Sequence, residues 1–229
     1  MEEIYSKIDG LKGDFVCTEC NHKQVVNVLQ YVNFNKNPEY YSLVKDLSIF
    51  KVKCEHCGAE KLIKYNLLLV DETHNYFLFF LSDRTLENRF KYQITYFVET
   101  VLNKDDKYDL DKCKTRLVFE LNDIIEKMTI FELGLDDEAI ELLKYSLLDK
   151  GLVDDPAYDC VYFDGMKDAD LVFCAISSKT STKEPIKISI RPKIYNKIVD
   201  DLANFKNRHH DLFEVIDQNW VREKFEKNK

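Results

Sequence analysis

Two cysteine pairs of identical spacing are the strongest chemical signal in this sequence. Cys17 and Cys20 form one C-x-x-C pair, and Cys54 and Cys57 form the second. Four thiolates suit a tetrahedral Zn²⁺ ion, and the close spacing lets each pair sit on a tight turn whose backbone N–H groups point at sulfur. We therefore expect one structural zinc ion per chain, bound by these four cysteines. The same ligands would also suit an iron ion, and the sequence does not separate the two metals.

The residue after each pair fits such a turn, here called a knuckle. The backbone there must adopt positive φ, which glycine tolerates best and asparagine next best. Gly58 follows the second pair and Asn21 follows the first. Strand-like segments flank both pairs, and the layout is that of a zinc ribbon. Residues 21–53 exceed the ~15–20 residues that separate the pairs of a compact ribbon, so this insertion is expected to contain a strand and a short helix of its own.

Other interpretations of the cysteines are weaker. One alternative is that the two pairs are unrelated buried thiols that do not come together. Another is a dithiol redox centre, which is disfavoured because neither pair opens a helix after a strand. Cys113, Cys160 and Cys174 lack metal-ligand spacing. We expect Cys160 and Cys174 to be small core residues, and none of the three to be a ligand or a disulfide partner. His22 and His56 lie beside the knuckles, where four thiolates already complete the metal shell.

The elements that must position these residues follow from the apolar pattern. Residues 61–70 and 76–81 read as a hairpin of two strands, and residues 40–46 as a short helix after Asn37-Pro38-Glu39. Leu86, Phe90, Ile94, Phe97 and Val101 make one apolar helical stripe. The pattern then predicts a polar link over 103–112, a helix capped by Asn122 or Asp123 that ends at Gly134, and a helix from Asp136 that stops at Gly151.

The last part of the sequence has a different pattern. Three strand-like runs cover 160–163, 171–176 and 186–190, with a turn predicted at Asp164-Gly165 after the first run. Pro192 opens a helix, and Asp211 is expected to open a last one towards Trp220. The predicted class is α+β. We expect a ribbon over about 13–81, a helical part over about 83–150, both within a domain 1–150, and a small α/β region over 151–229.

Composition limits the classes of function. The chain has 229 residues with 33 Lys and Arg against 41 Asp and Glu, a formal net charge of -8. Nucleic-acid and membrane-surface binders are normally basic, so this balance disfavours both. No apolar run approaches the ~20 residues that span a bilayer, and the acidic start lacks the features of a signal peptide. Seven cysteines, an odd number, argue against a closed disulfide framework. We expect a cytoplasmic protein.

The same residues resemble the CpXC family, a bacterial and archaeal group named for its C-P-x-C pairs. The resemblance covers about 13–150. It rests on the four paired cysteines and on a further set of positions: Val32-Asn33, Asn37-Pro38-Glu39, Gly58, Tyr65, Leu67-Leu68, Glu126-Lys127, Gly134-Leu135-Asp136-Asp137 and Glu141. Thr18 and Glu55 stand where the family name expects proline, and Asn21 replaces a glycine. The resemblance implies a bacterial, zinc-ribbon-containing protein of uncharacterised activity, and it implies no catalytic residue.

The expected function is therefore binding. No phosphate loop, dinucleotide fingerprint, metalloprotease motif or nucleophile elbow is present. Zinc held by four cysteines has no open position for water. We expect a non-catalytic adaptor that meets another protein through the Phe90–Val101 helix and the C-terminal strands, with no catalytic residue assigned. The alternatives are an enzyme with its active site in the C-terminal α/β region, and a weak nucleic-acid binder using Lys51, Lys53, Lys61 and Lys64 of the ribbon.

Overall fold

The computed structural model describes residues 11–149, 155, 157–179, 182–204 and 211–226. The chain contains both helices and sheets, which confirms the predicted α+β class. It divides into two compact units, Met1–Ile125 and Glu126–Lys229. The predicted boundary at 150/151 stays a prediction, since Gly151 and its neighbours lie outside the described residues. In the described part, no helix is both long enough and apolar enough to cross a membrane.

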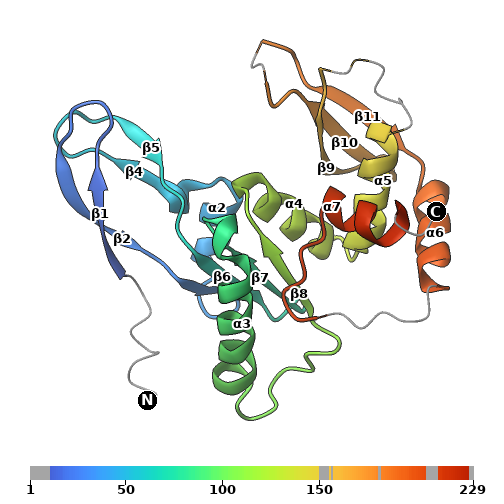
Figure 1. Cartoon of the computed structure of the whole chain (residues 1–229), viewed down its shortest axis with the longest axis horizontal. Helices are drawn as coiled ribbons and strands as arrows, with labels where there is room; N and C mark the ends of the chain where they lie inside the picture. Colours follow the sequence, from blue (N-terminus) through green and yellow to red (C-terminus); the bar gives the residue numbers. More distant parts are fainter. Residues whose placement is uncertain (1–10, 150–154, 156, 180–181, 205–210, 227–229) are drawn as a thin grey trace. The chain divides into compact units, whose positions relative to one another are not determined.

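The ribbon consists of two short antiparallel hairpins that lie side by side (Figure 1). Their strands are β1 Leu11–Val16 with β2 Lys23–Val28, and β4 Lys51–Lys53 with β5 Glu60–Leu62. Gln24 joins the hairpins, because its Nε2 donates to the Lys53 carbonyl at 3.1 Å and its Oε1 accepts from the Glu55 N–H at 2.9 Å. Each hairpin thus presents its cysteine pair to the other.

A mixed four-stranded sheet forms the core of the first unit. Its strands, in spatial order, are β3 Tyr31–Asn33, β6 Leu67–Asp71, β7 Tyr76–Phe80 and β8 Lys114–Val118. The pair β6–β7 is the predicted antiparallel hairpin, whereas β3 and β8 join it in parallel. Every residue of β6 and β7 is buried, and apart from Asp71 at the end of β6 both strands are continuous apolar runs without alternation.

Short helices accompany this sheet. They are α2 Glu39–Lys45, the 3₁₀ turns η1 Ser48–Phe50 and η2 Arg84–Leu86, α3 Glu87–Phe97 and the π-helical turn η3 Val98–Leu102. In α3 the predicted apolar stripe is only partly covered. Ile94 is buried, but Phe90 and Phe97 are half-buried and Leu86 is exposed.

The second unit combines helices with a three-stranded meander. Its elements are α4 Leu121–Glu132, which begins just before the boundary, α5 Asp137–Asp149, β9 Cys160–Lys167, β10 Asp170–Ile176, β11 Ile186–Ile190, α6 Pro192–Ala203, α7 Gln218–Val221 and the π-helical turn η4 Arg222–Glu226. The strands run in the order β11-β10-β9 and are all antiparallel. Phe163 and Phe173 meet edge to face across β9 and β10, with ring centroids 5.5 Å apart.

Two predictions about the strands were wrong. Residues 61–70 do not form one strand: β5 ends at Leu62 and β6 begins at Leu67, and between them Asn66 Oδ1 accepts from the Ser82 N–H and hydroxyl. The turn after the first C-terminal strand lies at Asp168-Ala169, because β9 continues through Gly165 and accommodates Asp164 as an extra residue without a partner position in β10.

Two helices also begin at residues other than those predicted. The last helix begins after Asp217, whose carboxylate accepts from the Asn219 and Trp220 N–H groups, and not at Asp211. Likewise α4 begins at Leu121, and Asp123 Oδ2 reaches back to accept from the N–H of Glu120. An acidic side chain in the first turn was therefore recognised correctly, but its exact position in the cap was not.

Candidate metal centre

The structure brings the four paired cysteines together. Their Sγ atoms all lie within 4.8 Å of one another, although 33 residues separate the pairs in sequence. Cys17 Sγ lies 3.7 Å from Cys57 Sγ, and Cys20 Sγ lies 3.6 Å from Cys54 Sγ. A regular tetrahedron with Zn–S bonds of ~2.3 Å has sulfur atoms about 3.8 Å apart. The four sulfur atoms therefore fit a tetrahedral metal ion.

Both knuckles have the backbone geometry that the sequence predicted. In the first, the Asn21 N–H donates to the Cys17 carbonyl at 2.9 Å; in the second, the Gly58 N–H donates to the Cys54 carbonyl at 2.9 Å. Asn21 has φ of 56° and Gly58 has φ of 73°. The expectation that these two residues adopt positive φ is confirmed.

The backbone also sets the electrostatics of the sulfur atoms. The N–H groups of Cys57 and His56 point at Cys54, and with the neighbouring thiols they lower the pKa of Cys54 to about 6. For Cys20 the His22 N–H acts in the same direction, but desolvation and hydrogen bonding with the other three thiols outweigh it and raise the pKa to about 12. Cys54 therefore ionises more readily than Cys20, and a divalent cation that binds thiolates would displace protons from the site.

The surroundings close the site on one side. Cys17 and Cys54 are buried with Phe15 in a small apolar cluster, whereas Cys57 is exposed. His22 and His56, which lie beside the knuckles, stack with ring centroids 5.5 Å apart.

An ion pair ties the first knuckle to the second hairpin. Lys61 Nζ of β5 lies 2.6 Å from Glu19 Oε1, which stands between Cys17 and Cys20. Hydrogen bonding to Lys61 lowers the pKa of the Glu19 carboxyl. The Lys61 side chain is 38% exposed and that of Glu19 56%, so solvent screens the pair and it adds orientation more than stability.

The remaining cysteines stay outside this cluster. All seven cysteines are thiols, and no disulfide is formed. Cys113 is half-buried, its Sγ donates to Asn75 Oδ1 at 2.8 Å, and burial raises its pKa to about 11. Cys160 and Cys174 are only half-buried on β9 and β10, so the prediction that they are core residues was wrong: the buried face of these strands carries their neighbours Val161 and Phe173 instead.

A buried network of charges in the second unit was not predicted. Lys127 Nζ lies 2.8 Å from Asp137 Oδ2, and Lys144 Nζ lies 2.8 Å from both Glu126 Oε2 and Glu141 Oε2. Desolvation raises the pKa of Glu141. Burial acts to lower the pKa of Lys144, but the two carboxylates raise it above its ordinary value. All five side chains are paired and nearly inaccessible, which is an arrangement for holding helices together.

The sequence held one signal for this network. The acidic and basic residues of the network interrupt the apolar pattern of α4 and α5. Charged residues in such a pattern are ordinarily interpreted as a solvated helix face. Glu126 also accepts from the Phe163 N–H at 2.6 Å, so its carboxylate links α4 to β9. Four of the five charged residues are among the positions that carried the family resemblance.

Fold and site define an α+β protein with a four-cysteine ribbon able to hold a metal ion. The family described as CpXC protein matches residues 15–144, which is more than half of the chain. The chain therefore belongs to the CpXC family, as the sequence resemblance indicated. Neither the curated proteins nor the solved structures contain a match to it.

Proposed function

We propose that Cys17, Cys20, Cys54 and Cys57 hold one structural Zn²⁺ ion, and that the protein acts by binding another protein. The observation that carries the metal assignment is the tetrahedral spacing of the four sulfur atoms. Four thiolates leave a zinc ion no position for a reacting water, so its contribution is structural.

The ribbon needs this support because its apolar core is small. Phe15, Cys17 and Cys54 are the buried members of its cluster, and β4 and β5 have three residues each. So little burial does not offset the loss of chain entropy in two isolated hairpins. A structural zinc ion contributes on the order of 10–16 kcal/mol of apparent free energy at pH 7, which is enough to order them.

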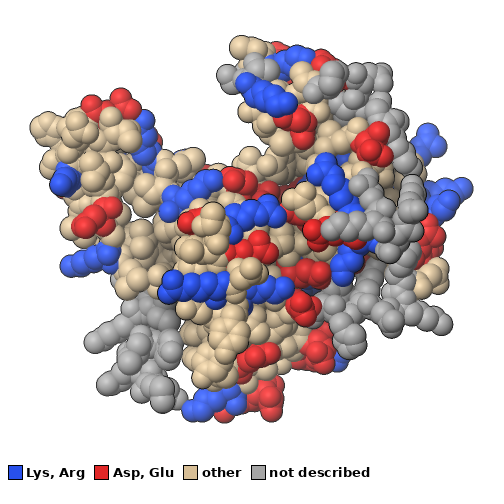
Figure 2. Space-filling view, in the orientation of Figure 1, with Lys and Arg blue, Asp and Glu red and all other residues tan. Residues whose placement is uncertain are grey.

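Charge favours a protein partner over nucleic acid. Two of the four lysines suggested for a basic face are engaged: Lys61 pairs with Glu19, and Lys64 Nζ lies 2.6 Å from Glu120 Oε2. On the face in Figure 2, basic and acidic side chains are interspersed and form no continuous basic stripe. With a net charge of -8, such a surface would be repelled by phosphates.

Apolar side chains are exposed on the ribbon itself. Asp14 pairs with Val25 and Val16 pairs with Lys23, so Val16 and Val25 are diagonal neighbours on one face of the β1–β2 hairpin. Both are about half exposed, at 49% and 58%. Apolar residues amid charged ones on a strand pair suit a protein contact.

The case for catalysis in the second unit is weaker than the case for binding. One cavity there, of about 250 Å³, contains a single hydroxyl and a single carboxylate among apolar side chains; its lining is Leu142, Ser146, Ile198, Asp201, Leu202 and Phe225. Ser146 and Asp201 do not supply the nucleophile, base and orienting group that covalent catalysis uses. Binding therefore remains the function that the geometry favours.

Elemental analysis of the intact protein, purified without added metal, tests the metal assignment. We expect one zinc per chain in the unchanged protein and in Cys113→Ser, which removes a thiol outside the cluster. Cys54→Ser should lower the zinc content and unfold the ribbon, seen as amide hydrogen exchange over residues 13–62. Stoichiometric iron would assign a different metal, and a metal-free protein with a protected ribbon would overturn the proposal.

A further inference from the structure

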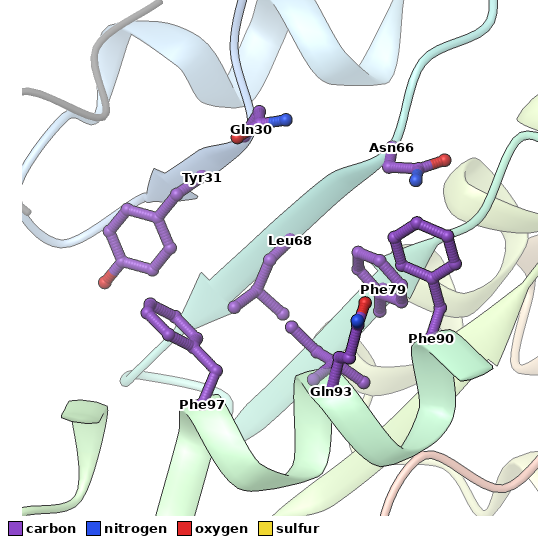
Figure 3. Close-up of a pocket in the computed structure, with 9 residues that line it drawn as sticks. Gln30, Tyr31, Asn66, Leu68, Phe79, Phe90, Gln93 and Phe97 are labelled. Carbon is purple, nitrogen blue, oxygen red and sulfur yellow. The ribbon is translucent and has the colours of Figure 1, made fainter. Parts of the chain in front are cut away.

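A cavity of about 280 Å³ lies between α3 and one face of the four-stranded sheet (Figure 3). Four aromatic rings and two aliphatic side chains surround it: Tyr31, Phe79, Phe90, Phe97, Leu68 and Ile94. It is the place where the apolar stripe of α3 remains half exposed. The first unit therefore keeps an apolar hollow open to solvent beside its core.

The size and lining restrict what the hollow accepts. Its volume is slightly below the roughly 300–1,000 Å³ of sites that enclose a whole small molecule, which suits a single large side chain. No charged residue lines it, so an arginine, lysine or carboxylate would lose its hydration without a partner. Ring edges and faces offer contacts that an aromatic group fulfils better than an aliphatic one.

Three carboxamides complete the rim: Gln30 and Asn66 on the side of the sheet, and Gln93 on α3 (Figure 3). Gln30 and Gln93 are exposed, and their side chains make no hydrogen bond within the described ranges. Asn66 Oδ1 is occupied by Ser82, so its Nδ2 is the group available to a ligand. A carboxamide offers one acceptor and two donors, which matches the C=O and N–H of a peptide group.

We propose that this hollow receives one aromatic side chain of a partner protein, while Gln30, Asn66 and Gln93 hydrogen-bond the peptide groups on either side of it. The inference rests on the proposed protein-binding function and gives it a site. Aromatic anchors in partly enclosed apolar hollows dominate the binding energy of many protein interfaces. Carboxamides at the rim then fix the direction of the bound segment without adding charge.

The probe for this site is acetyl-Gly-(5-fluoro-Trp)-Gly-amide, followed by ¹⁹F NMR with the full-length, metal-loaded protein. We expect a saturable shift that unlabelled acetyl-Gly-Phe-Gly-amide reverses about 3- to 10-fold more effectively than the Leu peptide, the range expected of ring–ring contacts. The Arg peptide and adenosine should not compete. No shift at millimolar probe, equal competition by Leu or Arg, or tighter competition by adenosine would each overturn the proposal.

Variants of one exposed position separate the site from the rest of α3. Gln93→Trp should fill the hollow with its own indole and weaken probe binding more than 10-fold, and Gln93→Ala should weaken it about 3-fold. The control is Tyr92→Trp, at a neighbouring residue that is 75% exposed and does not line the hollow. Zinc content is measured on every sample. A zinc-loaded protein that does not bind the probe would therefore contradict this binding site and leave the metal assignment intact.

Discussion

Asn21 and Gly58 occupy equivalent positions in the two knuckles and share a left-handed backbone conformation, with φ of 56° and 73°. Each donates its N–H to the carbonyl of the first cysteine of its pair, at 2.9 Å in both knuckles. The two turns are therefore built alike, although Gly58 has no Cβ and Asn21 has one. Asparagine is the side chain best able to take this conformation in place of glycine.

Gly58→Ala should therefore destabilise the metal-loaded ribbon by about 1–2 kcal/mol, the usual cost of left-handed backbone for a residue with a Cβ. Steric conflict adds little, because the nearest atom to the new methyl group is Lys53 Cε at 4.0 Å. Metal affinity from competition with a chromophoric chelator measures the loss. Asn21→Gly is the matched control and should change affinity by a few tenths of a kcal/mol. An equal loss in both variants would contradict a backbone origin.

Local patterns predicted the knuckles well because the chemistry is local. Cysteine spacing and the positive-φ residue lie within five positions of each other. The family resemblance extended the prediction to about 13–150, and the family matches 15–144. The four-stranded sheet was only half predicted. Parallel pairing of β3 with β6 and of β7 with β8 joins segments that no turn connects, so hydrophobic alternation carries no information about it.

Buried charge is the second feature that pattern alone missed. Lys127 and Asp137 stand ten residues apart, and Glu126 and Lys144 eighteen apart, so helical spacing does not pair them. The hollow beside α3 was missed for a related reason. An apolar stripe predicts the buried face of a helix, but the extent to which the sheet covers Phe90 and Phe97 depends on tertiary packing.

Lys144→Met should destabilise the second unit by about 3–5 kcal/mol, because it leaves the buried carboxylates of Glu126 and Glu141 without their shared cation. Urea denaturation followed by circular dichroism measures the change. Lys193→Met, on the exposed face of α6, is the control and should stay within about 0.5 kcal/mol. Adding Glu141→Gln to Lys144→Met should recover part of the loss; a further loss instead would contradict the charge explanation.

Glu72 gives the first unit an acid-sensitive contact. Hydrogen bonds from Lys107, Asn33 and Tyr108 hold the pKa of Glu72 at about 2, below its ordinary 4.5. A depressed folded-state pKa means that this stabilisation is complete above about pH 4.5 and is lost as the pH falls towards 2. Solvent screening limits it to about 1 kcal/mol, since the Lys107 side chain is 46% exposed.

Glu72→Gln should therefore lower stability at pH 7 by about 1 kcal/mol and flatten the pH dependence between pH 5 and 2. Thermal unfolding at a series of pH values measures both effects. Glu99→Gln, an exposed glutamate of η3, serves as the control and should leave the curve unchanged. An acid slope that survives Glu72→Gln would assign the pH dependence to other groups.

Cys113 should be the slowest of the thiols outside the metal centre to react with iodoacetamide. Burial raises its pKa to about 11 from an ordinary value of 9.0, so its thiolate population at pH 8 falls about 100-fold. We expect alkylation to be slowed by a similar factor relative to the urea-unfolded protein, measured by peptide mass spectrometry. Alkylation at the unfolded rate would show that the Cys113 thiol is not held against Asn75.

Cys160 and Cys174 should form no disulfide with each other under mild oxidation. Cys160 pairs with Ile176 and Cys174 with Tyr162 across β9 and β10, so the two cysteines are diagonal neighbours on one face of the sheet. Diagonal neighbours lie ~7–8 Å apart, beyond the usual reach of a disulfide. The mass of the unreduced, copper-treated protein measures this. The mass of Cys160→Ser after the same treatment should differ from that of the unchanged protein only by the mass of the substitution. A two-dalton loss that Cys160→Ser abolishes would mean that β9 and β10 slip from the register seen here.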